Sequence, residues 1–280
     1  MDNRRFRRLL FEVLDHDPTQ ADIRAFFERF KTLLQARGLS LKGITTDGSA
    51  LYPEVLAQVF PGVRHQVCEF HVLMDITQAV LHALAAVRRR LKHALPRLPR
   101  GRPSQAQRAA ARRVKRRQAR IAELFEHRHL FVRRDLTPAQ KKLLQRLVRL
   151  APELHPLRRI MDEVYRLFDR RCRSATALRK LALLRRQVSG LPRLSPALKK
   201  LFSPTLEKAL TFLDDRLLAS TSNAVERGNR RHRKMQKSVY RVRTQQNLRC
   251  RIALDMQRED QTSLRSQTTF FLHQQRRETG

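Results

Sequence analysis

The spacing of apolar residues in the first fifty positions predicts alternating strands and helices. Residues 9–14 form an apolar run that is typical of a strand. Apolar residues then recur at helical spacing over residues 23–34, after Thr19 as an N-cap, and the stripe stops at Gly38. A second apolar run covers residues 41–46. This order predicts a βαβ unit with parallel strands and a right-handed crossover.

Further along the chain, the pattern becomes helical almost throughout. Residues 52–60 predict a short helix with Pro53 near its start, and residues 65–68 predict a short strand. An apolar stripe over residues 70–87 predicts a long helix that runs into a basic region. From residue 121 to residue 218 the spacing is helical, with proline residues at helix starts or turns.

The order of these elements predicts an α/β chain that is mostly helical and carries an insertion. We expect residues 1–87 to form part of an α/β core and residues 88–218 to form a basic, all-α insertion. Residues 219–260 would then return as two helices that complete the core, and residues 261–280 would form a flexible tail. Pro and Gly residues at 96–104 predict an exposed loop.

The charge of the chain indicates a polyanionic partner. It has 60 Lys and Arg against 25 Asp and Glu, a formal net charge of +35, and nucleic acid is the first candidate for such a partner. A membrane-surface protein would need an amphipathic helix with exposed apolar residues, whereas Trp is absent here and the Phe residues lie at core-like spacings. The cations that we expect to contact DNA are Arg113, Arg116, Arg117, Arg227, Arg230, Arg233, Lys234 and Lys237.

Cysteine content and hydropathy indicate an intracellular protein. The three cysteines are far apart and odd in number, so they predict no disulfide framework and suit a reducing cytosol. No apolar run approaches the ~18 residues of a membrane span, and the N-terminus lacks the apolar core of a secretory signal. We therefore expect a soluble, intracellular protein without a membrane partner.

Two carboxylates stand out at positions where chemistry is common. Asp47 follows the predicted strand 41–46, and open α/β sheets place their ligands beyond the carboxyl ends of strands. Glu226 lies about one turn into a helix whose start is marked by Ser222 and Asn223. Each also has a structural interpretation, because Asp-Gly is a common turn pair and Asn-x-x-Glu fits the N-cap and N3 positions of a helix.

Carboxylates at the ends of separate elements suit two-metal phosphoryl transfer. Two Mg²⁺ ions about 3.5 to 4 Å apart stabilise the attacking and leaving oxygens at phosphorus, and hard oxygen ligands suit Mg²⁺ or Mn²⁺. If Asp47 and Glu226 share these ions, their carboxylates must lie within several ångströms of each other. The alternative from another class is a basic, non-catalytic nucleic-acid-binding protein, in which the two residues only shape a turn and a cap.

Three ordered motifs carry a resemblance to a known family. They are Thr-Asp-Gly-Ser at 46–49 with the following Leu-Tyr-Pro, the Cys-x-x-His pair Cys68 and His71, and Thr-Ser-Asn-x-x-Glu-Arg-x-Asn at 221–229. Together they resemble the catalytic domain of bacterial insertion-sequence transposases of the DDE type, over about residues 5 to 260.

The resemblance implies an RNase H-like fold in which three acids bind two divalent metal ions. Such an enzyme cuts double-stranded DNA at transposon ends and joins the freed 3′-hydroxyls to target DNA, usually as a multimer. Asp47 matches the second acid and Glu226 the third, with Asn223 and Asn229 as supporting residues. The first acid has no match, so we expect an N-terminally truncated domain that binds DNA without cleaving it.

Several other residue groups have alternative interpretations. Cys68 and His71, with His65 as a third ligand, suggest a zinc site, but no fourth ligand stands out. The alternative is that the pair packs and forms hydrogen bonds near the active site. Tyr165 and Tyr240 would be the nucleophiles of a tyrosine recombinase, but Tyr165 falls on an apolar stripe. The remaining candidates, His127, His129 and Cys172, are expected to be structural.

Overall fold

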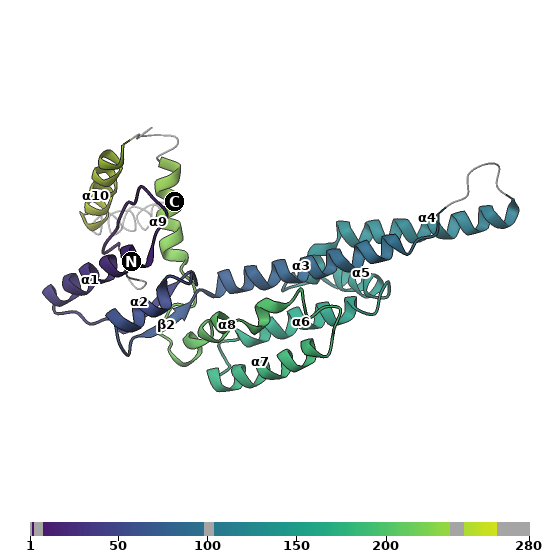
Figure 1. Cartoon of the computed structure of the whole chain (residues 1–280), viewed down its shortest axis with the longest axis horizontal. Coiled ribbons are helices and arrows are strands. Elements are labelled where there is room, and N and C mark those ends of the chain that lie inside the picture. Colours follow the sequence, from purple (N-terminus) through teal and green to yellow (C-terminus); the bar gives the residue numbers. More distant parts are fainter. Residues whose placement is uncertain (1, 3–7, 98–103, 236–243, 262–280) are drawn as a thin grey trace, which may run out of the picture. The chain divides into compact units, whose positions relative to one another are not determined.

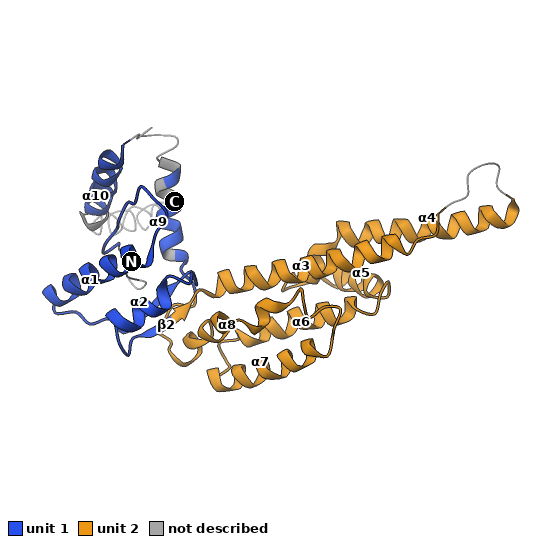
Figure 2. Cartoon of the chain, in the orientation of Figure 1, with its two compact units in different colours: residues 1–65, 221–280 blue, residues 66–220 orange. Residues whose placement is uncertain are grey.

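Helices dominate the described part of the chain, as the hydrophobic pattern predicted. Figure 1 shows the computed structural model of the whole chain. Two compact units divide it, and the chain passes from the first to the second and back (Figure 2). Unit 1 comprises residues 1–65 and 221–280, and unit 2 comprises residues 66–220. The structure describes residues 2, 8–97, 104–235 and 244–261.

Helix α1, Gln20–Ala36, begins where the sequence predicted. A capping box fixes its start, because the side chain of Thr19 accepts a hydrogen bond from the backbone N–H of Asp22 and the carboxylate of Asp22 accepts one in return. Its apolar stripe buries Phe27 and Phe30, which pack edge to face against Phe60. These aromatic contacts, with aliphatic residues of α1 and α2, form the core of unit 1.

Two strands and the helix between them follow α1. Strand β1, Gly43–Thr46, and strand β2, Arg64–Val67, form a parallel two-stranded sheet. Helix α2, Tyr52–Val59, connects them, so β1, α2 and β2 make a βαβ unit. The predicted second strand, short helix and third strand are therefore confirmed, with ends shifted by one or two residues.

The expected strand at residues 9–14 is wrong, because this segment joins no sheet. Leu9 and Leu10 pack against the aromatic core of unit 1, which explains the apolar run. The carbonyl oxygen of Val13 accepts hydrogen bonds from the side chains of Gln245 and Arg249. Side chains thus take up a backbone acceptor that a neighbouring strand would otherwise use.

The returning segment forms two helices, as predicted. Helix α9 is Asn223–Met235 and helix α10 is Gln245–Gln261. Lys237 and Tyr240 lie outside the described residues, as do nearly all of the predicted tail and most of the predicted loop at 96–104.

Helix α3, Glu69–His93, is the central helix of unit 2. It contacts α4 and α6, and it buries an apolar stripe that includes Ile76, Val80 and Val87. Among the described helices, α3 is the one that is long and apolar enough to cross a membrane by length and composition alone. Its buried stripe packs into the core of unit 2. The boundary that we expected at residue 87 falls inside this helix.

The other helices of unit 2 pack around α3 and α6. The most regular apolar stripe lies on α6, where Ile160, Val164 and Leu167 are buried as predicted. Proline residues stand at the starts of α5 and α8, also as predicted. These helices are α4 (Gln105–Glu126), α5 (Pro138–Val148), α6 (Leu154–Leu167), α7 (Ser174–Ser189) and α8 (Pro204–Lys208), with short 3₁₀ turns η1 (Arg128–Phe131), η2 (Lys199–Phe202) and η3 (Thr211–Asp214).

A buried glutamine joins the two ends of unit 2. Gln66 is fully buried; its amide nitrogen donates to the carbonyl oxygen of Ala209 at 2.8 Å, and its amide oxygen accepts from the backbone N–H of Phe212 at 2.9 Å. The backbone N–H of Glu69 donates to the carbonyl oxygen of Ser220 at 2.8 Å. Residues about 150 positions apart in sequence are thereby held together, which closes the helical unit on itself.

Candidate active-site residues and nucleic-acid interface

Asp47 lies directly after β1, where the sequence analysis placed it. Its side chain is exposed, and its Oδ1 accepts a hydrogen bond from the backbone N–H of Ser49 at 3.0 Å. Gly48 has a φ of 91°, which glycine adopts without strain. In the described part of the chain, no group donates to Oδ2 of Asp47. This turn holds the carboxylate at the carboxyl end of a parallel strand and leaves one oxygen for a ligand.

The charge of Asp47 affects the pKa of Tyr52, the first residue of α2. Burial raises the pKa of the Tyr52 hydroxyl, and the negative charge of Asp47 raises it further. The Tyr52 ring packs against Phe27, 6.2 Å between ring centroids. The turn that carries Asp47 is therefore followed directly by a residue anchored in the core of unit 1.

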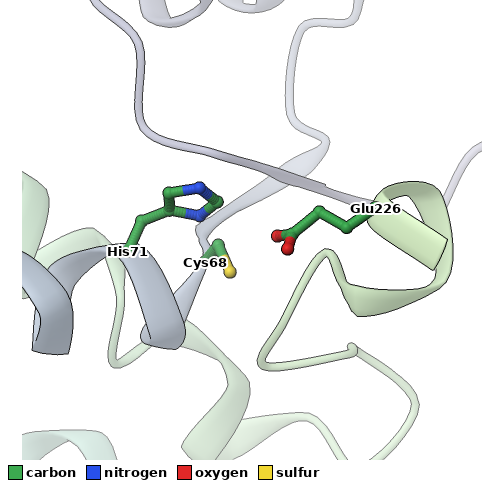
Figure 3. A group of neighbouring side chains, drawn as sticks. All are labelled: Cys68, His71 and Glu226. Atoms are coloured by element: carbon green, nitrogen blue, oxygen red, sulfur yellow. The ribbon is translucent and has the colours of Figure 1, made fainter. Parts of the chain in front are cut away.

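Glu226 lies in the first turn of α9 (Figure 3). The hydroxyl of Ser222 donates to Oε1 of Glu226 at 2.9 Å, and the backbone N–H of Glu226 donates to the carbonyl oxygen of Ser222 at 3.1 Å. The helix begins at Asn223, so Ser222 occupies the N-cap position and Glu226 is the fourth helical residue. The expected capping pair of Asn223 and Glu226 is therefore not the one that forms, and a buried serine orients the carboxylate instead.

Polar and basic side chains share the exposed surface of α9 with Glu226. Asn223 and Asn229 are exposed at positions three residues before and three residues after it, on the same face of the helix. Among the side chains of this helix that the structure describes, the exposed cations are Arg227, Arg230 and Arg233. Lys234 lies on α9, but its side chain is outside the described set. A carboxylate is thus followed by a row of cations along one helix.

Cys68 and His71 lie together at the start of α3 (Figure 3). Cys68 is completely buried and occupies the N-cap position, and the Sγ atom of Cys68 and a ring nitrogen of His71 lie within 4.8 Å of each other. The three cysteines, all of them described, form no disulfide, as the sequence indicated. The Cys-x-x-His motif therefore places its two side chains side by side through the turn that starts α3.

The third zinc ligand that we considered has another role. Nε2 of His65 forms a hydrogen bond with Oγ1 of Thr46 at 2.9 Å, which joins β1 and β2. In the described residues, neither His65 nor Asp47 belongs to a group of three or more side chains that could hold a metal ion. A zinc site built on His65, Cys68 and His71 is therefore not formed in this structure.

The remaining candidates from the sequence lie in the helical packing of unit 2. The hydroxyl of Tyr165 donates a hydrogen bond to the carbonyl oxygen of Val132. Burial raises the pKa of this hydroxyl. Nζ of Lys180 lies 3.8 Å from Sγ of Cys172. The rings of His127 and His129 lie 6.2 Å apart near η1.

Sequence reasoning missed Glu69, the first residue of α3. Burial raises the pKa of its carboxyl, against the effects of a hydrogen bond with Ser220 and of the charges of Arg134 and Arg170. The available signal was its position inside the Cys-x-x-His motif, next to the buried Cys68. Its contacts within unit 2 came only from folding, because Ser220 is far away in sequence.

Helix α4 carries the second group of expected DNA contacts. Arg113, Arg116 and Arg117 are all exposed on it, and no described carboxylate pairs with them. Near its C-terminal end, the guanidinium groups of Arg88 and Arg128 stack on the ring of Phe125, 4.0 Å and 4.3 Å from its centroid. These three arginines of α4 thus face solvent, and within the described ranges no acidic side chain neutralises them.

Comparison with known proteins identifies the family. The model of the ISL3 family of DDE-type sequences, described as transposase, matches residues 5–252, which is most of the chain. Neither the curated proteins nor the solved structures contain a match. The matched region includes both acidic positions, the Cys-x-x-His pair and all of unit 2. The chain therefore belongs to the ISL3 family of insertion-sequence transposases of the DDE type.

Proposed function

We propose that this chain is the catalytic domain of a DNA transposase of a bacterial insertion sequence, with Asp47 and Glu226 as two of its catalytic acids. The observation that carries the proposal is their placement. Asp47 follows a parallel strand and Glu226 is held by Ser222 at the start of a helix, in a chain of this family. The proposed fold is an RNase H-like core, residues 1–87 and 219–260, interrupted by an all-α insertion, residues 88–218.

The two carboxylates suit the metal ions that this family generally uses. Both offer hard oxygen donors, as Mg²⁺ and Mn²⁺ prefer, and Asp47 Oδ2 accepts no hydrogen bond from a described residue. Two such ions, when bound, stabilise the attacking and leaving oxygens of an in-line displacement at a DNA phosphate. We propose that Asp47 and Glu226 converge to hold them when metal and DNA bind.

Each of the other proposed residues has a distinct task. Ser222 orients the carboxylate of Glu226 through its hydroxyl hydrogen bond. Asn223 and Asn229 flank Glu226 on the same face, where their amides can position the DNA backbone. Cys68 and His71 pack together at the start of α3 and support the site without a zinc ion. The cations of α9 neutralise the phosphates of the DNA that Glu226 approaches.

We also propose that double-stranded DNA, both transposon ends and target, is the substrate, and that the protein multimerises on it. The formal charge of +35 supports nucleic acid as the partner. A bacterial cytosolic location, with association to the nucleoid, follows from this substrate.

Metal binding tests the assignment without requiring catalysis. Mn²⁺ binding to the full chain, with duplex DNA present, is measured by electron paramagnetic resonance for Asp47→Asn and Glu226→Gln. Each change removes a charged ligand, so we expect each to weaken binding by about tenfold or more. Asp17→Asn and Glu28→Gln remove exposed carboxylates elsewhere in unit 1 and serve as matched controls. Equal affinity in all four variants and the wild type would refute the metal site.

DNA cleavage is measured separately, on duplexes that carry the ends of the element. We expect this chain to bind DNA without cutting it, because none of its residues has been assigned to the first acid. Nicking that requires Mg²⁺ and disappears in Asp47→Ala would overturn this expectation and would support Asp47 as a catalytic residue. Tight DNA binding with no metal site would instead favour a non-catalytic basic binding protein.

A further inference from the structure

The region between α3 and the end of α4 is unusual in its charge. From residue 76 to residue 122 the chain has fourteen Lys and Arg residues and no Asp or Glu. Seven of these cations lie on α4 between Arg108 and Arg120, and all seven are exposed. Glu123 of α4 forms an ion pair with Arg146 of α5. Among the described residues, no carboxylate pairs with the seven cations. No ion pair within the described part of the fold neutralises their charge.

The cations of α4 are arranged in a row opposite its buried side. Val114, Ile121 and Leu124 are buried and define the packed face. Residues four positions apart lie nearly above one another on a helix, and this spacing aligns four arginines on the solvent face. From first to last they extend over about 18 Å at 1.5 Å per residue. This α4 arginine row consists of Arg108, Arg112, Arg116 and Arg120.

The first turns of α4 have almost no tertiary support. Every side chain from Ser104 to Ala110 is exposed, and Figure 1 shows this end of α4 extending past the other helices of unit 2. A capping box of Ser104 and Gln107 starts the helix, and its sequence is rich in Ala, Arg and Gln, which favour helix. Arginines at i and i+4 repel each other, by about 0.2–0.5 kcal/mol for each pair. The helix therefore forms by local propensity, against a repulsion that bound phosphates would remove.

We propose that the α4 arginine row binds the phosphate backbone of duplex DNA independently of sequence, as a contact separate from the catalytic acids. The proposal rests on the proposed transposase function, which supplies DNA as the polyanion. Free guanidinium groups in a row, on a helix that projects into solvent, suit phosphates along a duplex backbone. The row would hold DNA that flanks the reacting phosphates or belongs to the target.

A lipid surface fits the helix less well than DNA does. Membrane-surface helices present large apolar residues opposite their cations. On α4 the exposed positions around the arginine row are filled by Ala, Gln and further cations, and the large apolar residues before Phe125 are buried. The row therefore offers electrostatic contacts without an apolar face to insert.

The salt dependence of DNA binding tests the row. Affinity of the full chain for a 30-base-pair duplex of arbitrary sequence is measured by fluorescence anisotropy from 50 to 400 mM KCl. Replacing all four arginines of the row by Gln keeps the helix propensity and removes four phosphate contacts. We expect the slope of log affinity against log salt to fall in magnitude by about three to four, and the affinity at 0.1 M salt to fall about tenfold or more.

Two matched variants distinguish the effect of the α4 arginine row on DNA binding from the effect of net charge. The first replaces four exposed cations elsewhere in unit 2, Lys141, Lys142, Arg179 and Arg186, by Gln, and we expect a slope change of less than about one. The second replaces the row by Lys, which keeps the charges and should keep most of the slope. Circular dichroism of each variant checks that the fold is intact.

Each outcome has a defined meaning. Equal losses in the row variant and the elsewhere variant would overturn the proposal, because binding would then depend on net charge alone. Absence of DNA binding by the wild-type chain would instead refute the proposed function. Tighter binding to duplex RNA, or to vesicles of anionic phospholipid, than to DNA would also overturn the proposal. A larger loss of duplex DNA affinity and of salt slope in the row variant than in the elsewhere variant, with an intact fold in both, supports it.

Discussion

The two units are built on different physical bases. Unit 2 has a large, mostly aliphatic core that contains many completely buried leucines, and its helices pack on α3 and α6. The core of unit 1 is smaller and combines three phenylalanines with aliphatic residues of α1 and α2. Both proposed catalytic acids belong to unit 1. The comparison indicates that most of the hydrophobic stabilisation lies in one unit and the proposed chemistry in the other.

The comparison predicts that a core substitution in unit 2 lowers stability far more than a substitution of a proposed catalytic acid in unit 1. Leu157 is completely buried in α6, so Leu157→Ala should lower the free energy of unfolding of unit 2 by about 2–5 kcal/mol through lost burial and a cavity. Asp47 is exposed, and Asp47→Ala should change stability by about 0.5 kcal/mol or less. Urea denaturation followed by circular dichroism measures both. A larger loss in Asp47→Ala than in Leu157→Ala would contradict this division of roles.

A buried carboxylate of unit 2 should have the next largest effect. Oε1 of Glu153 lies 2.7 Å from Arg90 and 3.0 Å from Arg193. Burial alone would raise the pKa of Glu153, but its hydrogen bonds and the two arginines outweigh burial and lower it. Glu153→Gln should cost about 1–2 kcal/mol at pH 7, because both arginines are partly exposed and screened by water.

The stability difference between wild type and Glu153→Gln should depend on pH. Since the folded-state pKa of Glu153 is lowered, its ionised form stabilises the fold at any pH above the ordinary value of 4.5. That contribution is lost as the pH falls through the lower folded-state pKa. The stability difference between wild type and Glu153→Gln should therefore narrow below about pH 4.5. A constant difference from pH 3 to pH 7 would show that the ion pairs do not stabilise unit 2.

The smallest predicted effect compares two capping boxes. Thr19 caps α1, which packs in the core of unit 1, whereas Ser104 caps the end of α4 that buries nothing. Thr19→Ala should cost about 1 kcal/mol of global stability. Ser104→Ala should loosen only the first turns of α4, visible as faster amide hydrogen exchange there with an unchanged unfolding midpoint. Equal losses of global stability would show that the first turns of α4 are packed after all.

Local patterns were enough to predict most of the elements. The capping residue Thr19 and the apolar stripe after it located α1, and Pro53 marked the start of α2. The stripe of Ile160 and Val164 located α6. Asp47 and Glu226 were likewise placed at a strand end and in a first helical turn, where the structure has them. Neighbouring residues decide these features, because caps and helical stripes act over a few positions.

The strand expected at residues 9–14 failed for a reason that no local pattern contains. An apolar run becomes a strand only if a partner strand takes up its backbone groups. Here Val13 gives its carbonyl to Gln245 and Arg249, more than 230 positions away. The cap of α9 differs from the expected one by a single position, because the buried Ser222 rather than Asn223 contacts Glu226.

The sequence by itself determined the charge, the helical character, the order of the motifs and the family. Tertiary structure alone decided that Gln66 closes unit 2 on Ala209 and Phe212, and that His65 bonds to Thr46 instead of joining a metal site. It also decided which cations of α4 face solvent. The physical reason is that burial and hydrogen bonding between distant residues depend on which surfaces pack together. The spacing of residues along one segment describes the surface of that segment but not the surface that it packs against.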